Sequence, residues 1–314
     1  MKNSIRIAFF GSPELAAACL SGLLIEFPVA LVVTQPDREV GRGRKFRETP
    51  VSRVANAENI SLLKISKMDR GLLNACRGQE INLIVVVAFG MILPEYLLLY
   101  PDHGALNLHA SLLPKHRGAS PIESSLMKGE RITGMTVQLM GQKMDAGDVI
   151  SRMEVSLGPE TTAEDLMDTF ICQAPGFLVR SINDYLSGRA KPEKQNEGEA
   201  SYCSKISKED GRIEWGESAE SIVNKIRAFN LWPVAFTSLD GKILRIFRAH
   251  LYRFQSEERQ EPGRIVKIDR TEGIVIQTGK GLIGITELQQ ENKRRMGHIE
   301  FMHGYRNLLG KMLN

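Results

Sequence analysis

A group of chemically active side chains lies in the segment 104–122, which reads GALNLHASLLPKHRGASPI. In an extended strand the side chains alternate between two faces, so Asn107 and His109 are expected to lie next to each other on one face. An amide and an imidazole would then stand side by side near the end of the strand. A buried Asn and His that are satisfied by their neighbours would give the same spacing, and this structural role is the commoner one for an isolated Asn-x-His.

Two carboxylates further along the chain favour a catalytic group over a structural pair. Asp145 and Asp148 flank an Ala-Gly turn that follows the apolar run Met135–Met140. Turns of this kind are where an α/β sheet presents side chains to a ligand. Either aspartate could instead bond the amides of its own turn, which is the commoner role for such residues.

Asn, His and Asp together suit the transfer of an acyl group from one nitrogen to another. When an amine attacks a carbonyl carbon, negative charge develops on the oxygen, and Asn107 and a protonated His109 could donate hydrogen bonds to that oxygen. Asp145 could hold His109 in its charged form and take or relay the proton that the attacking nitrogen loses. A serine hydrolase is disfavoured because no Ser or Cys lies in a nucleophile-elbow motif. Metal binding is not supported, because the sequence has no HxH, HExxH or carboxylate cluster.

The elements that must position these residues have the pattern of an α/β domain. Ile5–Phe10 is a short apolar strand, Ser12 is placed to cap a helix, and Leu15–Leu24 gives the apolar body of that helix. Val29–Val33 and Ile81–Ala88 are nearly continuous apolar runs, which is typical of strands covered by helices on both faces. The pattern predicts a doubly wound, mostly parallel sheet, in which ligands bind beyond the carboxyl ends of the strands.

We expect three parts along the chain. Residues 1–188 would form the α/β domain with an inserted loop at 34–49, and residues 207–314 would form a second domain. Residues 189–206 are predicted to link them, since 189–200 reads RAKPEKQNEGEA and offers no large apolar side chain to a core.

The second domain has the spacing of short antiparallel strands. Asp240-Gly241 is a hairpin turn between Ala235–Leu239 and Lys242–Phe247. Three more strands, each bounded by Gly-bearing turns, are expected at Gly263–Ile268, Gly273–Thr278 and Leu282–Leu288. This spacing predicts a small, OB-like β-barrel, which with a positive charge is a plausible platform for nucleic acid.

The positive charge of the chain is concentrated in two places. The formal net charge is +4, but residues 1–200 carry −1 and residues 201–314 carry +5. Within the first part, Arg38–Arg47 (REVGRGRKFR) alone carries +4. Such a run is most often a solvated loop, although a flexible segment of this charge could also order against phosphates. Lys293–Arg295 is a second basic cluster.

Composition excludes several classes of protein. With 314 residues, 42% hydrophobic and 25% charged, the chain is typical of a globular protein of about two domains. The longest apolar run, Ile84–Leu93, is about half of the roughly 20 residues that cross a bilayer, so no membrane span is expected. The four cysteines are isolated from one another, which suits a reducing cytoplasm.

The motifs around the polar group resemble a known family. Asn107-Leu-His109-Ala-Ser111-Leu-Leu-Pro114, then Arg117-Gly118 and Asp145-Ala-Gly-Asp148, closely resemble the formyltransferases that use 10-formyltetrahydrofolate. The resemblance implies a formyltransferase-like variant of the Rossmann fold, with Asn107, His109 and Asp145 catalytic. It also implies that Ser111, Leu112, Leu113 and Pro114 contact the folate co-substrate. His116 departs from the family pattern, since an aromatic residue is usual there, and it could alter the edge of the pocket.

Other segments resemble the branch of this family that acts on methionyl-tRNA. They are Thr34–Arg38, Gly41–Lys45, Ser207–Trp215 and Arg227–Pro233, and the resemblance extends from Ile7 to about Gly284. It implies that the loop 34–49, through Arg42, Arg44 and Lys45, and the C-terminal barrel bind initiator methionyl-tRNA. We further expect a cytoplasmic monomer without a metal.

Two other functions stay open for this sequence. An enzyme of the same chemistry could formylate a sugar nucleotide or glycinamide ribonucleotide, although such an enzyme would not need the Arg-rich loop. A catalytically silent RNA-binding protein on the same fold is disfavoured by the intact set of Asn107, His109 and Asp145.

Overall fold

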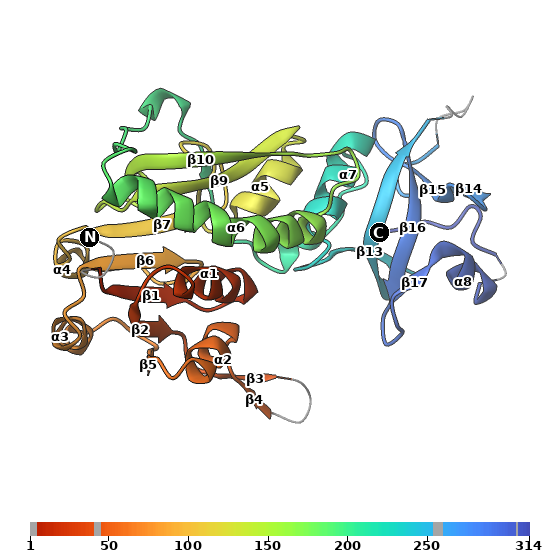
Figure 1. The fold of residues 1–314 in the computed structure, drawn as a ribbon. Coiled ribbons are helices and arrows are strands. Elements are labelled where there is room, and N and C mark those ends of the chain that lie inside the picture. The colour runs from red at the N-terminus through yellow and green to blue at the C-terminus, as the bar shows by residue number, and fades with distance from the viewer. Residues whose placement is uncertain (1–4, 41–44, 254–259, 306) are drawn as a thin grey trace. The chain divides into compact units, whose positions relative to one another are not determined.

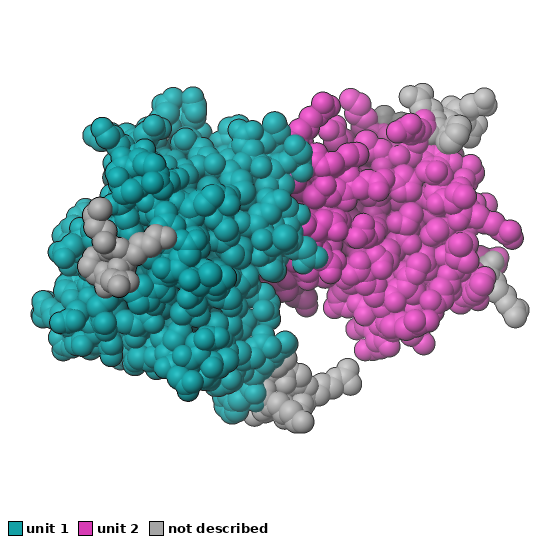
Figure 2. All heavy atoms as spheres, in the orientation of Figure 1, with its two compact units in different colours: residues 1–121, 132–156, 167–203 teal, residues 122–131, 157–166, 204–314 magenta. Residues whose placement is uncertain are grey.

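The computed structural model describes residues 5–40, 45–253, 260–305 and 307–314. The chain forms two compact units (Figure 2). Unit 1 comprises Met1–Pro121, Ile132–Ser156 and Met167–Cys203, and unit 2 comprises Ile122–Arg131, Leu157–Leu166 and Ser204–Asn314. Two short segments from the middle of the chain therefore belong with the C-terminal part, which the predicted division at 188 and 207 did not include.

Unit 1 is built on a seven-stranded sheet (Figure 1). From one edge to the other its strands are β10 (Asp148–Ser156), β9 (Ile132–Leu139), β7 (Ala105–His109), β6 (Leu83–Val87), β1 (Ile7–Gly11), β2 (Val29–Thr34) and β5 (Ser61–Lys64). The five strands from β7 to β5 run parallel, while β9 is antiparallel to β7 and β10 is antiparallel to β9. The predicted mostly parallel sheet is confirmed.

Helices cover both faces of this sheet, which explains why β1 and β6 are buried along their whole length. Ala8 and Phe10 of β1 belong to a core shared with α3 (Arg70–Gly78) and α4 (Glu95–Leu98). α1 (Glu14–Leu24) and α6 (Ala163–Leu186) lie on the other face, and they meet where Gly22 lies against Pro175. The remaining helices are α2 (Pro50–Ala57) and α5 (Pro121–Met127) in the N-terminal half and α7 (Ala219–Ala228) and α8 (His298–His303) in the C-terminal half.

The start of α1 differs from the expectation in one detail. Ser12 does not cap the helix: the N-cap is Pro13, and it makes no side-chain capping bond. The Ser12 hydroxyl accepts the backbone N–H of Gln35 (3.2 Å) and the hydroxyl of Thr34 (3.2 Å). Ser12 therefore ties the turn after β1 to the end of β2.

The segment expected to be a linker is attached to unit 1. Glu193 forms a backbone bridge with Val149, and β11 (Tyr202–Cys203) pairs in parallel with β8 (Arg117–Gly118). Between these pairings, Gln195 is buried and Glu197–Glu199 forms a short 3-10 helix. This polar segment therefore pairs with the backbone of unit 1 and is not an extended linker in solvent.

Unit 2 contains an antiparallel sheet packed against α7. Its strands follow the order β12 (Ala235–Leu239), β13 (Lys242–Tyr252), β16 (Leu282–Gln290), β15 (Gly273–Gln277) and β14 (Ile265–Asp269), and β17 (Met296–Gly297) pairs with β16. The edge strands β12 and β14 are both bridged to the end of the chain, through Leu239 with Leu313 and Arg264 with Met312. The C-terminal residues thus close the sheet, as the predicted barrel requires.

None of the helices in the described part of the chain is both long enough and apolar enough to cross a lipid bilayer.

Candidate active site

β7 presents Asn107 and His109 on one face, as the alternation of strand side chains predicts. Asn107 is half-buried and His109 is buried. Asn107 lies opposite Gln138 of the antiparallel neighbour β9, so these two side chains share a face. Because the Gln138 amide donates to Asp145 Oδ1 (3.1 Å), the carboxylate is brought to the same face of the sheet as Asn107 and His109.

Both ring nitrogens of His109 face oxygen atoms. Nε2 lies 2.9 Å from the backbone carbonyl oxygen of His116, which can only accept, so Nε2 carries a proton. Nδ1 lies 3.7 Å from Asp145 Oδ1. The side chains of His109 and Asp145 are 7% and 14% exposed, so both groups are largely removed from solvent. Nε2 thus donates its proton to the backbone, and Nδ1 is the nitrogen beside the Asp145 carboxylate, which would stabilise a protonated imidazole.

Asp145 is held by contacts from two other segments. Its Oδ2 accepts the backbone N–H of Gly118 at 2.9 Å, and its Oδ1 accepts from Gln138. The residue has φ of +52°, a left-handed conformation that costs a non-glycine residue roughly 1–2 kcal/mol. Asp148 instead begins β10. Of the two carboxylates, Asp145 is the one that faces His109, and the amide it bonds comes from Gly118 and not from its own turn.

The segment Ser111–Pro114 is fixed by hydrogen bonds to Lys115 and to Thr136 of β9. Ser111 Oγ donates to the Lys115 carbonyl (2.6 Å), and Thr136 Oγ1 donates to the Ser111 carbonyl (2.7 Å) and accepts the Leu113 N–H (3.0 Å). Ser111, Leu113 and Pro114 are buried, and Leu112 is the least buried of the four. The bonds shape this loop, and Leu112 keeps the most surface for a ligand.

The basic loop contains a short antiparallel hairpin, β3 (Arg38–Val40) and β4 (Lys45–Arg47). Lys45 begins β4, while Arg42 and Arg44 lie outside the described residues. At the base of the hairpin, Nη2 of Arg38 donates to Oε1 of Gln35. Nε2 of Gln35 in turn donates to the backbone carbonyl of Phe89 at 2.7 Å. The loop is therefore tied to the segment that follows β6.

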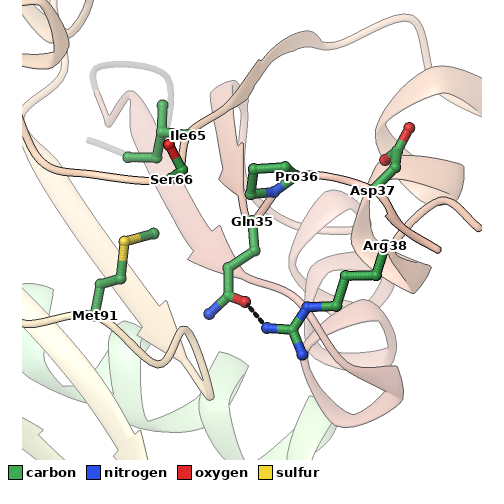
Figure 3. Close-up of a pocket in the computed structure, with 7 residues that line it drawn as sticks. All are labelled: Gln35, Pro36, Asp37, Arg38, Ile65, Ser66 and Met91. Carbon is green, nitrogen blue, oxygen red and sulfur yellow. Dashed lines mark hydrogen bonds between the residues drawn. The ribbon is translucent and has the colours of Figure 1, made fainter. Parts of the chain in front are cut away.

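A pocket of about 340 Å³ lies beside this contact (Figure 3). Its lining comes from the segments that follow β2, β5 and β6, and comprises Gln35, Pro36, Asp37, Arg38, Ile65, Ser66 and Met91. This is the carboxyl end of the parallel strands, where α/β sheets bind ligands. The pocket adds Gln35 and Met91 to the candidate binding residues, which sequence reasoning missed.

Gln138 and Gly118 are further site residues that sequence reasoning did not assign. Gln138 is a polar residue within the apolar run Met135–Met140 and is 2% exposed, so this interruption is the signal that marks it. Gly118 was visible only as part of the Arg117-Gly118 motif. His116 contributes its carbonyl to His109, and its side chain is 1% exposed, which leaves it little surface at the edge of a pocket.

Among the residues that the structure describes, no group of three or more His, Cys, Asp or Glu side chains is placed to hold a metal ion.

Comparison with known proteins identifies the family. The model of the formyl transferase family matches residues 5–182, and that of the formyl transferase C-terminal domain matches residues 205–306. The chain belongs to the formyl transferase family. The first match contains Asn107, His109 and Asp145 as well as Gln138 and Gly118.

Several curated members of the formyl transferase family are similar over almost the whole chain. A methionyl-tRNA formyltransferase of Clostridium perfringens (strain 13 / Type A) is 39% identical over 311 residues, covering 98% of this chain and 100% of that protein. One from Halothermothrix orenii is 37% identical over 307 residues, covering 96% and 97%.

Several solved structures share the fold of this chain. HypX from Aquifex aeolicus, in complex with tetrahydrofolic acid, has a TM-score of 0.64 at 18% identity and covers 98% of this chain, which spans 48% of HypX. Methionyl-tRNA formyltransferase from Clostridium thermocellum has a TM-score of 0.53 at 16% identity and covers 80% of this chain and 95% of that one.

Proposed function

We propose that this chain transfers the formyl group of 10-formyltetrahydrofolate to the free α-amino group of methionyl initiator tRNA, for translation initiation. The observation that carries the chemistry is the pairing of His109 with Asp145 on the face of β7 that also presents Asn107. The acceptor is supported by the methionyl-tRNA formyltransferases that match the chain from end to end.

The transfer proceeds by attack of the neutral amine on the formyl carbon. An α-amine has a reference pKa near 8, so about a tenth of it is neutral at pH 7 and no strong base is needed. Asn107 and a protonated His109 stabilise the oxygen as it becomes negative. The nitrogen that has attacked then loses its proton towards Asp145, the bond from carbon to N10 of the folate breaks, and N10 takes up a proton.

Both substrates have candidate contacts in the chain. Leu112 and the pocket beside Gln35 and Met91 offer apolar and amide surface to the folate at the carboxyl end of the sheet. The basic loop, with Arg42, Arg44 and Lys45, and the C-terminal domain at 207–314, with its charge excess, supply the cations that an RNA acceptor requires. The proposal includes a monomer that acts in the cytoplasm, and light scattering tests the oligomeric state.

The test is a transfer assay with two acceptors. The protein is incubated with 10-formyltetrahydrofolate and methionyl-tRNA, using initiator tRNA in one reaction and elongator tRNA in the other, and the amino acid released from each tRNA is analysed. We expect formylmethionine from the initiator. A separate reaction offers a sugar nucleotide in place of tRNA. Formylation there and of neither tRNA would assign the chain to another acceptor, and no transfer from the folate at all would refute the chemistry.

A further inference from the structure

Gln195 makes four hydrogen bonds beside the candidate active site. Its Nε2 donates to the backbone carbonyls of Asp145 (2.9 Å) and Gly147 (2.7 Å). Its Oε1 accepts from Nε (3.1 Å) and Nη2 (2.9 Å) of Arg117. These bonds use the full capacity of a glutamine amide, two donors and two acceptor lone pairs. The residue lies far from the catalytic motifs in the sequence and is 9% exposed.

The chemistry of the partners allows one orientation of this amide. A guanidinium only donates and a backbone carbonyl only accepts, so turning the amide over would oppose donor with donor and acceptor with acceptor. Gln195 therefore links two groups, donating to one and accepting from the other. One is the turn that carries Asp145, and the other is the buried Arg117.

The turn needs such a support because its backbone is constrained. Asp145 has φ of +52°, and a Cβ on Gly147 would lie 2.0 Å from the Leu139 carbonyl oxygen. Gln138 holds the turn from β9, since its Oε1 accepts the Gly147 N–H (3.2 Å) while its amide donates to the Asp145 carboxylate. Gln195, from the linker-like segment 189–200, bonds the backbone carbonyls of Asp145 and Gly147. The two glutamines together fix the direction of the Asp145 carboxylate.

Arg117 links this support to His109 as well. The guanidinium is 1% exposed and is neutralised by Glu197 at 2.7 Å. Residues on either side of Arg117 bond the catalytic pair: the His116 carbonyl accepts from His109, and the Gly118 N–H donates to Asp145. The same short segment thus positions the imidazole and the carboxylate, and Gln195 joins it to the turn.

We propose that Gln195 is a positioning residue for formyl transfer, holding the turn 145–147 so that Asp145 faces His109. The inference rests on the proposed function, because it takes Asp145 and His109 as the catalytic pair. It assigns a role in the reaction to a segment whose composition alone indicates a linker.

Gln195→Glu keeps the bonds with Arg117 and removes the bonds with the turn 145–147. The glutamate keeps the shape and can still accept from Arg117, but its second oxygen faces the Asp145 and Gly147 carbonyls without a proton to donate. We expect kcat to fall about 10- to 100-fold, because misplacement of a catalytic group by about 1 Å has effects of this size. KM for both substrates should stay within about two-fold, since all four hydrogen bonds of Gln195 are used within the protein.

Gln173→Glu is the matched control, because Gln173 is exposed on α6 and receives the same change of charge. Circular dichroism and the folded fraction are measured for each variant, so that kcat is expressed per folded molecule. Should Gln195→Glu not fold, Gln195→Met takes its place, since it removes the four bonds without adding a buried charge, and it has the same expected kcat.

A second readout does not depend on the reaction. The imidazole NMR resonances of His109 should move in Gln195→Glu and stay in place in Gln173→Glu. A folded Gln195 variant with kcat within about two-fold of the original, or with unchanged His109 resonances, overturns the inference and leaves the proposed function standing. If the unsubstituted protein transfers no formyl group to methionyl-tRNA, the proposed function fails whatever the variants do.

Discussion

At the scale of single residues, the site depends on how a few polar groups share their hydrogen bonds. Asp145 gives one oxygen to the Gly118 N–H and the other to Gln138, and still faces the His109 ring. His109 in turn bonds the His116 carbonyl. Groups from 116–118, β7 and β9 therefore meet at Asp145, and substitutions can test the charge of Asp145 and its position one at a time.

Asp145→Asn tests the charge. The amide oxygen can still accept the Gly118 N–H, but the negative charge that faces His109 is removed and the proton acceptor is lost. We expect kcat to fall about 10²- to 10⁴-fold, the usual effect of removing a general acid or base. Binding of tRNA, measured by filter retention, should stay within a few-fold. A similar loss of binding and of kcat would show that Asp145 is structural.

The cysteines test the packing of unit 1 through their reactivity. Burial raises the pKa of Cys19 to about 12 and that of Cys76 to about 11, while Cys172 is exposed. At pH 8 the folded protein should react with iodoacetamide at Cys172 and spare Cys19 and Cys76, because only the thiolate is nucleophilic. Mass spectrometry of the peptides reads this out, and rapid labelling of Cys19 would contradict the packing of α1.

The same two thiols affect stability at high pH. Their pKa values are raised in the folded state, so above about pH 9 the unfolded chain loses these protons while the folded chain keeps them. The free energy of unfolding should therefore fall as pH rises from about 9 towards 11. Urea unfolding at a series of pH values measures this, and stability that rises over that range would contradict it.

At the scale of elements, the pairing of β8 with β11 decides whether the linker-like segment reaches the site. Gly118 makes the close approach possible: its φ is +129°, and a Cβ there would lie 2.0 Å from the Cys203 carbonyl oxygen. The neighbouring Arg117 then contacts Gln195 and Glu197 from the same segment. A glycine at this point thus couples a backbone pairing to the geometry of Asp145.

Gly118→Ala should separate β8 from β11. The added methyl group clashes with backbone atoms, so we expect a loss of about 1–3 kcal/mol in the free energy of unfolding, together with a lower kcat. Gly78→Ala is the control, because nothing lies within 4 Å of a Cβ there. Guanidinium unfolding compares the two, and equal stability of both variants would mean that the pairing is dispensable.

At the scale of the whole molecule, two features extend beyond single elements: the closure of unit 2 and the distribution of charge. The final residues of the chain bridge β12 and β14, and Leu313 is 3% exposed within the core of unit 2. Positive charge is concentrated in residues 38–47, at +4, and residues 201–314, at +5, while the other residues together carry −5. The closure of unit 2 bears on the free energy of unfolding, and the distribution of charge bears on binding of an RNA partner.

Leu313→Ala tests the closure. Removing a buried leucine side chain typically costs about 2–5 kcal/mol, so unit 2 should unfold at a clearly lower denaturant concentration. Leu309→Ala is the matched control, because Leu309 is 65% exposed. Tryptophan fluorescence follows the transition, since Trp215 is buried in the same core. Equal midpoints for the two variants would show that the C-terminal segment does not hold the sheet closed.

Arg42→Ala tests the charge. If Arg42 contacts a phosphate of the tRNA, its loss weakens binding and lowers the slope of log affinity against log salt concentration by about 1. Arg77→Ala, at an exposed position on α3, removes the same charge elsewhere. Binding is measured at several salt concentrations, and identical slopes for the original protein and Arg42→Ala would remove this residue from the interface.

The sequence by itself determined the features that follow from local periodicity. The alternation in 105–109 places Asn107 and His109 on one face, the continuous apolar runs become the buried strands β1, β2 and β6, and Asp240-Gly241 forms the turn between β12 and β13. These predictions hold because side-chain direction in a strand and the demands of a tight turn depend on neighbouring residues alone.

Tertiary structure decided everything that joins distant parts of the chain. It selected Asp145 over Asp148 as the partner of His109, buried Gln195 in a segment that has the composition of a linker, and used Leu313 to close unit 2. Gly118 and Gln195 lie 27 and 50 positions from Asp145 in the sequence. Contacts over such separations depend on the path of the backbone, which leaves no periodic signal in the residues that make them.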